Sequence, residues 1–131
     1  MTTDELTRFA ESYAKAWCSQ NPESVAAFFA QRGSISINNG PPAVGRAAIA
    51  REAQAFMTTF PDMIVTFDRL EPRRDATAFH WTLLGTNSGP GGTGNRVRIS
   101  GYELWKIDND GLIGESKGHF DAAEYERQLR G

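Results

Sequence analysis

After residue 60 the hydrophobic pattern of this chain changes from mainly helical spacing to the alternation of strands, and that change limits the folds the chain can adopt. Apolar residues recur at helical spacing over residues 6–17 and again over residues 46–60. Between them, Asn21 and Pro22 predict the start of a short helix with Val25, Phe28 and Phe29 as its buried side, and residues 34–38 predict one strand. From residue 63 onward apolar and polar residues alternate, which predicts strands over 63–70, 76–86, 97–107 and 112–120, then a closing helix over 122–129.

Helices that come first and strands that follow in succession indicate an α+β fold. The turn residues 108–111 predict a tight hairpin between the last two strands, and the glycine-rich residues 87–95 predict a mobile hairpin loop. No helix follows that loop, so its glycines do not fit a cradle for nucleotide phosphates. At 131 residues, we expect a single domain over 1–131, with helices packed on one face of a curved antiparallel sheet.

Composition excludes several classes of partner and cofactor. The net charge of −2 provides no basic surface for nucleic acid. Cys18 is the only cysteine, and no group of His, Cys and carboxylate residues has ligand spacing, so we expect no disulfide, no metal and no other cofactor. No apolar run approaches the roughly 20 residues that cross a bilayer, and the start lacks a signal-peptide pattern. We therefore expect a cytoplasmic domain without a membrane partner.

One expected strand carries a glutamate on its apolar face. The alternation over 97–107 places Glu103 on the same face as Val97, Ile99, Gly101, Trp105 and Ile107. A buried carboxylate is costly unless it is paired, hydrogen-bonded or neutral. A raised carboxyl pKa beside an apolar cavity also permits acid–base chemistry at neutral pH. Two interpretations remain open: Glu103 lines a pocket, or a register shift moves it to the rim of the sheet.

The order of several short motifs resembles a known superfamily over nearly the whole chain. These motifs are Tyr13-Ala14-Lys15-Ala16-Trp17, Val44-Gly45-Arg46-Ala47-Ala48-Ile49, Phe60-Pro61-Asp62, Trp81-Thr82, Gly85-Thr86, the strand over 101–107, Asp110-Gly111, Asp121-Ala122-Ala123 and Gln128-Leu129. Together they resemble the nuclear transport factor 2-like superfamily, in particular its ketosteroid isomerase and SnoaL-like polyketide cyclase branch. The resemblance implies a cystatin-like, cone-shaped antiparallel sheet that wraps around the N-terminal helices. It does not decide activity, because this fold hosts many chemistries and some non-enzymes.

The resemblance also implies roles for individual residues. Tyr13 matches the oxyanion tyrosine of the isomerases, and Glu103 matches the neutral carboxylic acid beside it. The general base of the isomerases falls on Asn38 and Asn39 here, and an amide cannot abstract a proton. The His and Asp that the cyclases carry on their last strand fall on Ser116 and Gly118.

His119 and Asp121 are the reserve candidates for acid–base catalysis. Alternation places both on the face opposite Ser116 and Phe120, although a β-bulge would reverse that parity. Asp121 is also explained as a helix N-cap, with Glu124 three residues on. The candidate ligand contacts are Trp17, Asn39, Phe56, Phe60, Trp81, Trp105, Ser116 and Phe120. The aromatic residues among them more often belong to the core than contact a ligand.

Three functions remain open. The first is a small enzyme that acts by acid–base chemistry on an apolar carbonyl or hydroxyl compound, as an isomerase, cyclase or dehydratase. The second, favoured by the missing base, is a non-catalytic carrier or sensor of a hydrophobic small molecule. The third is a dimeric interaction module with a vestigial cavity. A homodimer is expected in any case, because Leu84, Tyr102 and Leu104 make the outer face of the expected sheet too apolar to be fully solvated, and the resemblance implies the same. The sequence names neither a substrate nor a pathway.

Overall fold

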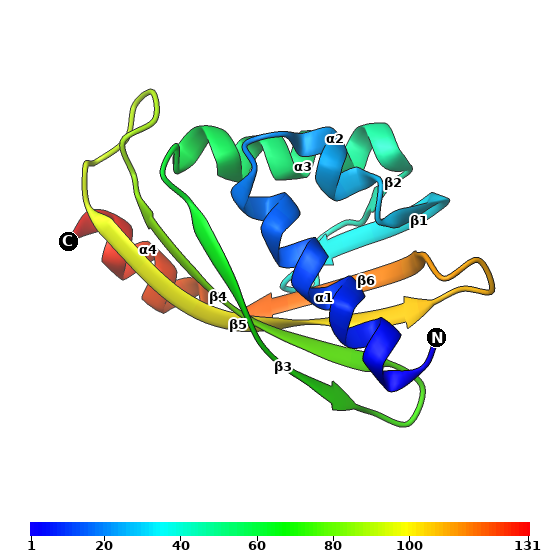
Figure 1. Ribbon diagram of the computed structural model, residues 1–131. Coiled ribbons are helices and arrows are strands. Elements are labelled where there is room, and N and C mark those ends of the chain that lie inside the picture. The colour runs from blue at the N-terminus through cyan, green and yellow to red at the C-terminus, as the bar shows by residue number, and fades with distance from the viewer.

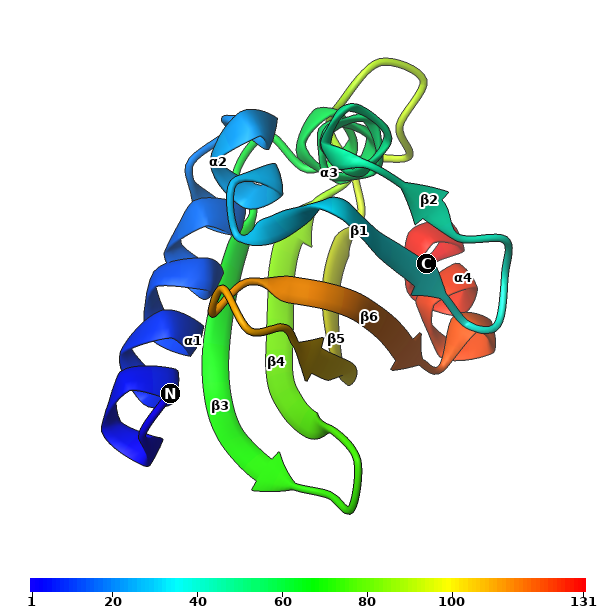
Figure 2. The ribbon, with the colours of Figure 1, turned by 90° about the vertical axis from the view of Figure 1, so that its right-hand side faces the viewer.

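The computed structural model describes residues 1–131 as one sheet with four helices (Figures 1 and 2). The elements in chain order are α1 (Thr3–Cys18), α2 (Pro22–Ala26), β1 (Phe29–Ile37), β2 (Ala43–Val44), α3 (Arg46–Thr59), β3 (Ile64–Pro72), β4 (Thr77–Thr86), β5 (Arg96–Ile107), β6 (Ile113–Phe120) and α4 (Ala122–Arg130). The three N-terminal helices lie on one side of a curved sheet, and α4 lies at the end of the sheet where the chain finishes. The expected α+β architecture is confirmed.

The sheet has the strand order β2-β1-β6-β5-β4-β3. β3 to β6 form an antiparallel meander, as the alternating segments predict. β1, however, runs parallel to β6, so the expected antiparallel sheet contains one parallel pairing. The reason is connectivity: the chain leaves β2, crosses through α3 to the far edge at β3, and meanders back until β6 docks beside β1.

Local sequence signals explain where the first two helices begin. Thr2 accepts a hydrogen bond from the Glu5 backbone N–H, and the Glu5 carboxylate accepts one from the Thr2 N–H, which completes a capping box. Asn21 caps α2 through its side chain, and Pro22 occupies the first turn, where a missing N–H costs nothing. α1 then turns one apolar stripe toward the sheet, which buries Tyr13 and Trp17 one turn apart.

The aromatic core lies between α1 and the concave face of the sheet. The Trp105 ring stacks on Phe79 with centroids 4.7 Å apart, and the Tyr13 ring meets both edge-on at 5.2–5.3 Å. Such contacts add to the free energy of burial because ring edges and faces carry opposite partial charges. Tyr13 is thereby held rigidly against the sheet. None of the helices combines the length and hydropathy needed to cross a bilayer.

Candidate functional site: a buried carboxyl beside an apolar cavity

Glu103 lies on the concave face of β5 and is only 6% exposed. β4 and β5 pair without a bulge along their whole length, and β5 pairs regularly with β6 from Gly101 to Lys106. The parity that the sequence predicts for this strand therefore holds, and a register shift to the rim is excluded. Glu103 faces inward, with Phe79 of β4 and Gly118 of β6 as its direct neighbours across the sheet.

Three donors converge on one oxygen of this carboxyl. Glu103 Oε1 accepts hydrogen bonds from the Tyr13 hydroxyl at 2.9 Å, Trp105 Nε1 at 3.1 Å and Ser116 Oγ at 2.7 Å. Trp105 reaches it because residues two apart on a strand share a face. Ser116 reaches it because β6 places Ser116 directly opposite Trp105. One oxygen of the carboxyl is thus fully occupied, and its side chain is fixed.

Burial and hydrogen bonding act on the acidity of this pair in opposite directions. Desolvation raises the pKa of Glu103 above its ordinary value, and the hydrogen bonds from Ser116, Trp105 and Tyr13 offset only part of that rise. The pKa of Tyr13 is raised well above its usual range, first by burial and then by the charge of Glu103. Tyr13 therefore stays a neutral hydrogen-bond donor, while Glu103 is the group of the pair that can exchange a proton.

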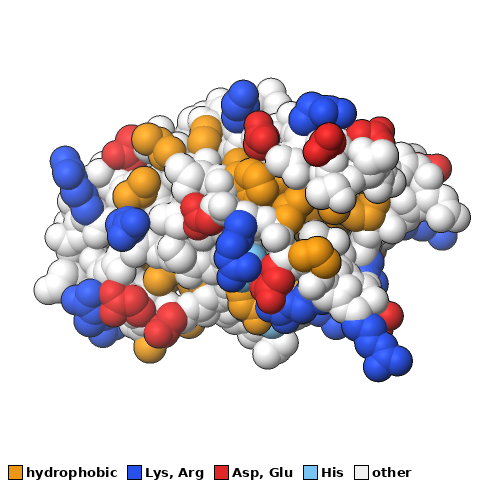
Figure 3. Space-filling view, turned by 60° about the horizontal axis from the view of Figure 1, so that its bottom comes forward, with side chains coloured by type: hydrophobic (Ala, Val, Ile, Leu, Met, Phe, Trp, Pro, Cys, Tyr) orange, Lys and Arg blue, Asp and Glu red, His pale blue; other side chains and the backbone are white.

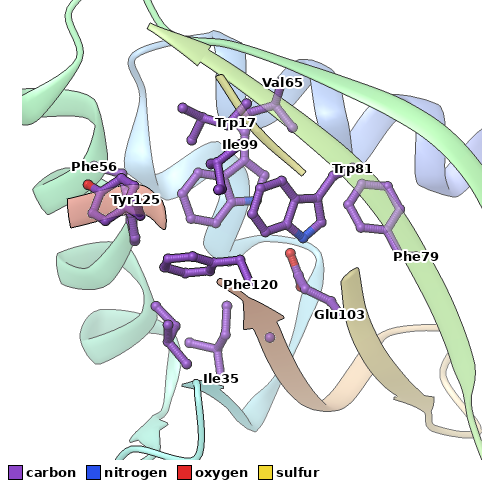
Figure 4. A pocket seen from close by; sticks show the side chains of 13 residues that line it. Trp17, Ile35, Phe56, Val65, Phe79, Trp81, Ile99, Glu103, Phe120 and Tyr125 are labelled. Atoms are coloured by element: carbon purple, nitrogen blue, oxygen red, sulfur yellow. The ribbon is translucent and has the colours of Figure 1, made fainter. Parts of the chain in front are cut away.

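The other oxygen of the carboxyl borders a cavity. Glu103 Oε2 accepts no hydrogen bond from the chain and is not fully enclosed, and Glu103 is the one acidic residue that lines a cavity of about 60 Å³ (Figure 4). Apolar side chains make up nearly all of the remaining wall. The lining residues besides Glu103 are Trp17, Ile35, Ile37, Phe56, Val65, Phe79, Trp81, Leu83, Ile99, Gly118, Phe120 and Tyr125.

A glycine allows one aromatic wall of this cavity to form. Gly101 pairs with Trp81 across the sheet. A Cβ on Gly101 would lie 2.6 Å from Trp81 Cζ2 and 2.4 Å from the His119 carbonyl oxygen, which is too close for either atom. The indole of Trp81 therefore lies over a bare backbone and extends along the cavity wall. The Phe120 ring meets Trp81 edge-on, with centroids 6.0 Å apart.

The candidate residues from the sequence divide into three groups by position. Trp17, Phe56, Trp81 and Phe120 border the cavity beside Glu103. Tyr13, Phe60, Trp105 and Ser116 are buried but do not border it. Of these, Tyr13, Trp105 and Ser116 orient the carboxyl from behind, which differs from an arrangement in which a tyrosine and an acid both face the ligand.

Three further candidates lie outside the cavity. Asn39 is exposed, has a left-handed backbone with φ of 62°, and borders a separate shallow groove together with His119 and Asp121. His119 packs against the Tyr102 ring on the outer face, the side of the sheet turned away from α1 to α3. Asp121 accepts a hydrogen bond from the Glu124 N–H as the N-cap of α4. The geometry brings none of these three to Glu103.

Tyr125 is a cavity residue that the sequence did not single out. It projects from α4, and its ring packs edge-on against Phe120 and Phe60. Burial raises its pKa, and its hydroxyl has no hydrogen-bond partner within the chain. In the sequence, the i, i+4 spacing of Tyr125 and Leu129 on the closing helix could have indicated that both side chains face the core. No group of three or more His, Cys, Asp or Glu side chains is placed to hold a metal ion.

The curved sheet with helices on its concave side has the nuclear transport factor 2-like, ketosteroid isomerase-like fold. The chain belongs to the SnoaL-like polyketide cyclase family, whose sequence model matches residues 7–129. No curated protein matches the sequence.

Solved structures confirm the fold. TsrD from Streptomyces laurentii superposes with a TM-score of 0.82 at 17% identity, over 98% of this chain and 97% of that one. A protein with a ketosteroid isomerase-like fold from Catenulispora acidiphila DSM 44928, in complex with trimethylamine, gives 0.79 at 17% identity over 98% and 94%. SalBIII, an epoxide hydrolase/cyclase-like enzyme with a role in pyran ring formation in salinomycin, gives 0.78 at 16% identity over 95% and 97%. At these identities the likeness establishes architecture alone.

Proposed function

We propose that this protein is a small-molecule enzyme that uses Glu103 as its acid–base group on an apolar carbonyl or hydroxyl compound. The observation that carries the proposal is the asymmetry of the carboxyl: Oε1 accepts three hydrogen bonds, whereas Oε2 has none and borders the apolar cavity. A group held in one orientation by neighbours, with its reactive atom free, is what proton transfer requires. Membership of a cyclase family is compatible with such chemistry, and so is the likeness in fold to the cyclase-like enzyme SalBIII.

The raised pKa of Glu103 fits this role. A carboxyl is a stronger base when desolvation disfavours its ionised form, so it removes a weakly acidic C–H or O–H proton more readily. The same oxygen can return that proton to a different atom, which completes an isomerisation, a ring closure or a loss of water. Because Tyr13, Trp105 and Ser116 all donate to Oε1, they stabilise the charge that forms when Oε2 loses its proton.

Exchange of a carbon-bound proton tests this role without knowledge of the natural substrate. We would incubate the protein with 1-indanone in D2O and follow loss of the proton signals next to the carbonyl by NMR. Glu103 Oε2 takes one of these protons, the electron pair passes to the carbonyl oxygen, and deuterium returns to the carbon. The wild-type rate should rise with pH through a pKa above that of an exposed glutamate, because the ionised form is the base.

Two variants decide whether Glu103 carries the exchange. Glu103→Gln should lower the rate by about 10²–10⁴-fold, the usual contribution of a positioned base. Glu115→Gln is the matched control, because Glu115 lies on the neighbouring strand, paired with Lys117 outside the cavity. Exchange that survives in Glu103→Gln would refute the proposal.

A non-catalytic binder of hydrophobic small molecules is the second candidate. The observation that favours it is that no His, Cys, Lys, Arg or second carboxyl borders the cavity. Glu103 therefore has no second group of these types in the cavity wall with which to share proton transfer. Binding of 1-indanone without any exchange above the background would favour this function over the enzyme. Absence of both would favour a dimeric interaction module with a vestigial cavity.

A further inference from the structure

Trp81 presents an unpaired hydrogen-bond donor at the cavity. The chain has three indole N–H groups. That of Trp105 donates to Glu103. That of Trp17 is fully enclosed and lies beside the Tyr13 hydroxyl. The N–H of Trp81 makes no hydrogen bond within the chain and, unlike that of Trp17, is not fully enclosed. Because Trp81 lines the cavity, its N–H is the indole donor that a ligand can reach.

The sheet register brings this donor next to Glu103. Phe79 of β4 pairs with Glu103 of β5, and Trp81 follows Phe79 by two residues on the same face, so Trp81 is a diagonal neighbour of Glu103. The indole leans across β5 because Gly101 has no side chain: Trp81 Cζ2, on the nitrogen side of the ring system, would lie 2.6 Å from a Cβ on Gly101. Figure 4 shows the indole nitrogen turned toward the carboxyl of Glu103, whereas the Tyr125 hydroxyl lies at the other end of the cavity.

We propose that Trp81 is the oxygen-binding residue of this cavity, and that its indole N–H donates to the carbonyl oxygen of a neutral ligand whose adjacent C–H group faces Glu103 Oε2. This assignment deepens the proposed function and rests on it for the role of Glu103. A carbonyl compound with hydrogen on the adjacent carbon matches both groups, because its oxygen accepts the N–H and its C–H bond presents a proton to the carboxylate. The ligand is neutral because no cation lines the cavity and Glu103 would repel an anion.

The same N–H assists the proton transfer. When Glu103 Oε2 removes a proton from the carbon, the C–H electron pair forms an enolate and negative charge collects on the carbonyl oxygen. A donor that faces this oxygen in an apolar cavity stabilises the charge as it forms. The Tyr13 hydroxyl is not available for this role, because it already donates to Oε1 behind the carboxyl. Return of the proton, or of a deuteron taken up from D2O, from Oε2 to the carbon restores the ketone.

Two probes of nearly the same shape isolate the hydrogen bond. Cyclopentanone carries the carbonyl, and methylenecyclopentane carries a CH2 group in place of the oxygen; single rings suit the small volume of about 60 Å³. We would measure their dissociation constants by NMR titration with the wild type, Trp81→Phe and Trp17→Phe. Trp17→Phe is the matched control, because it makes the same change in the same cavity wall at an indole whose N–H is enclosed. Circular dichroism of each variant confirms that it is folded.

The deciding quantity is the dissociation constant of methylenecyclopentane divided by that of cyclopentanone, because a loss of apolar contacts affects both probes. Trp81→Phe should lower this ratio about three- to tenfold, the range expected for one hydrogen bond to a neutral donor. Trp17→Phe should leave the ratio unchanged. A second measurement needs no variant: in the wild type, the indole proton of Trp81 should move downfield with cyclopentanone only, and those of Trp17 and Trp105 should not distinguish between the probes.

Exchange in D2O separates the two roles of the donor. Trp81→Phe should slow exchange of the protons beside the carbonyl of bound cyclopentanone by roughly 10²–10³-fold, the loss seen when one donor to a developing oxyanion is removed. The proposed function and the oxygen site can fail separately. A ratio that depends on Trp81, together with exchange that does not depend on Glu103, would refute the proton-transfer role and leave Trp81 as the oxygen-binding residue of a non-catalytic binder.

Other results would overturn the oxygen site itself. A ratio that is unchanged in Trp81→Phe, or lowered equally in Trp17→Phe, would show that Trp81 does not bind the carbonyl, while the role of Glu103 stays open to its own test. If cyclopentanol loses more affinity than cyclopentanone in Trp81→Phe, the site holds a hydroxyl, and the assignment to a carbonyl ligand is wrong. If no probe binds, the cavity is not a ligand site, and the oxygen site and the proposed function both fall.

Discussion

Replacement of Glu103 by glutamine should change how the stability of this protein depends on pH. The amide keeps an oxygen in the Oε1 position, where it can accept the same three hydrogen bonds, but it cannot ionise. The folded-state pKa of Glu103 is raised above its reference value of 4.5, chiefly by desolvation. The protonated carboxyl therefore favours the folded state below pH 4.5. That contribution is lost as the pH rises through the folded pKa, because the unfolded chain ionises first.

The magnitude follows from linkage. Between the unfolded and folded pKa values of one group, stability changes by up to about 1.4 kcal/mol for each pH unit. The free energy of unfolding of the wild type, minus that of Glu103→Gln, should thus fall from pH 4.5 upward and level off above the folded pKa. Other titrating groups cancel in this difference. Glu124, whose pKa of about 2 reflects its pairing with Arg127, has no contact with the site.

The assay is urea unfolding followed by far-ultraviolet circular dichroism, at pH values from 4 to 8, for both proteins. A difference that rises with pH over this range would refute the reasoning. It would show that the three hydrogen bonds on Oε1 outweigh desolvation and hold Glu103 as a carboxylate with a lowered pKa. The sign of one slope therefore decides which of two opposed physical effects controls the site.

Three further predictions concern the same core and the outer face. Tyr13→Phe should lower the free energy of unfolding by about 1 kcal/mol. Because the Tyr13 hydrogen bond lowers the pKa of Glu103, its removal should also extend the pH-dependent loss of stability to higher pH. An unchanged pH dependence in urea unfolding would contradict this. Gly101→Ala should cost about 1–3 kcal/mol through clashes with the His119 carbonyl oxygen and with Trp81. Gly118→Ala, whose Cβ meets only atoms at 3.4 Å and beyond, should be tolerated, and equal costs in denaturation would be inconsistent with the packing. Light scattering on a size-exclusion column should show a homodimer, and a monomer of 14.4 kDa would disprove it.

The outer face of the sheet carries both apolar and charged side chains. Ile64 and Leu84 pair directly across β3 and β4 and are both exposed. Apolar side chains on the lower side of the molecule nevertheless alternate with acidic and basic ones (Figure 3). Tyr102 adds a more organised element, since the rings of His80 and His119 pack on its two sides across three neighbouring strands. Such a mixture of apolar and polar surface is typical of interfaces between protein copies.

Periodicity predicted the strands well wherever the ladder is regular. The inward position of Glu103 follows from alternation alone because β5 carries no bulge between Val97 and Lys106. β3 does shift its register between Phe67 and Arg69, and nothing in the alternation of that segment marks the shift. Short elements were harder to predict from the sequence. β2 spans only two residues, and Phe29 begins β1, although its spacing had assigned it to the preceding helix α2.

The site could be predicted only as far as single elements determine it. The alignment of Glu103 and Trp105 is a property of one strand, and the apposition of Ser116 requires only the pairing of β5 with β6. The positions of Trp17 and Tyr125 in the cavity wall depend on how α1 and α4 dock against the sheet, which no local pattern encodes. The position of His119 and Asp121 on the face opposite Ser116 could be predicted from alternation, because β6 keeps its parity from Glu115 to Phe120.

The size of the cavity then limits what can occupy the site. About 60 Å³ is well below the roughly 300–1,000 Å³ of pockets that enclose drug-sized ligands, so even a two-ring ligand such as 1-indanone requires the wall to move. One side of the wall is α4, none of whose residues is fully buried, although Tyr125 and Leu129 pack against the core. Hydrogen bonds from Thr93 and Asn95 to the Leu129 carbonyl, and between Gln128 and the Arg98 backbone, secure its end. Displacement of α4 would withdraw Tyr125 from the cavity and leave Glu103 in place, because the three donors to its carboxyl come from α1, β5 and β6. A shift of α4 would thus enlarge the cavity without breaking the three hydrogen bonds that the proposed proton transfer requires.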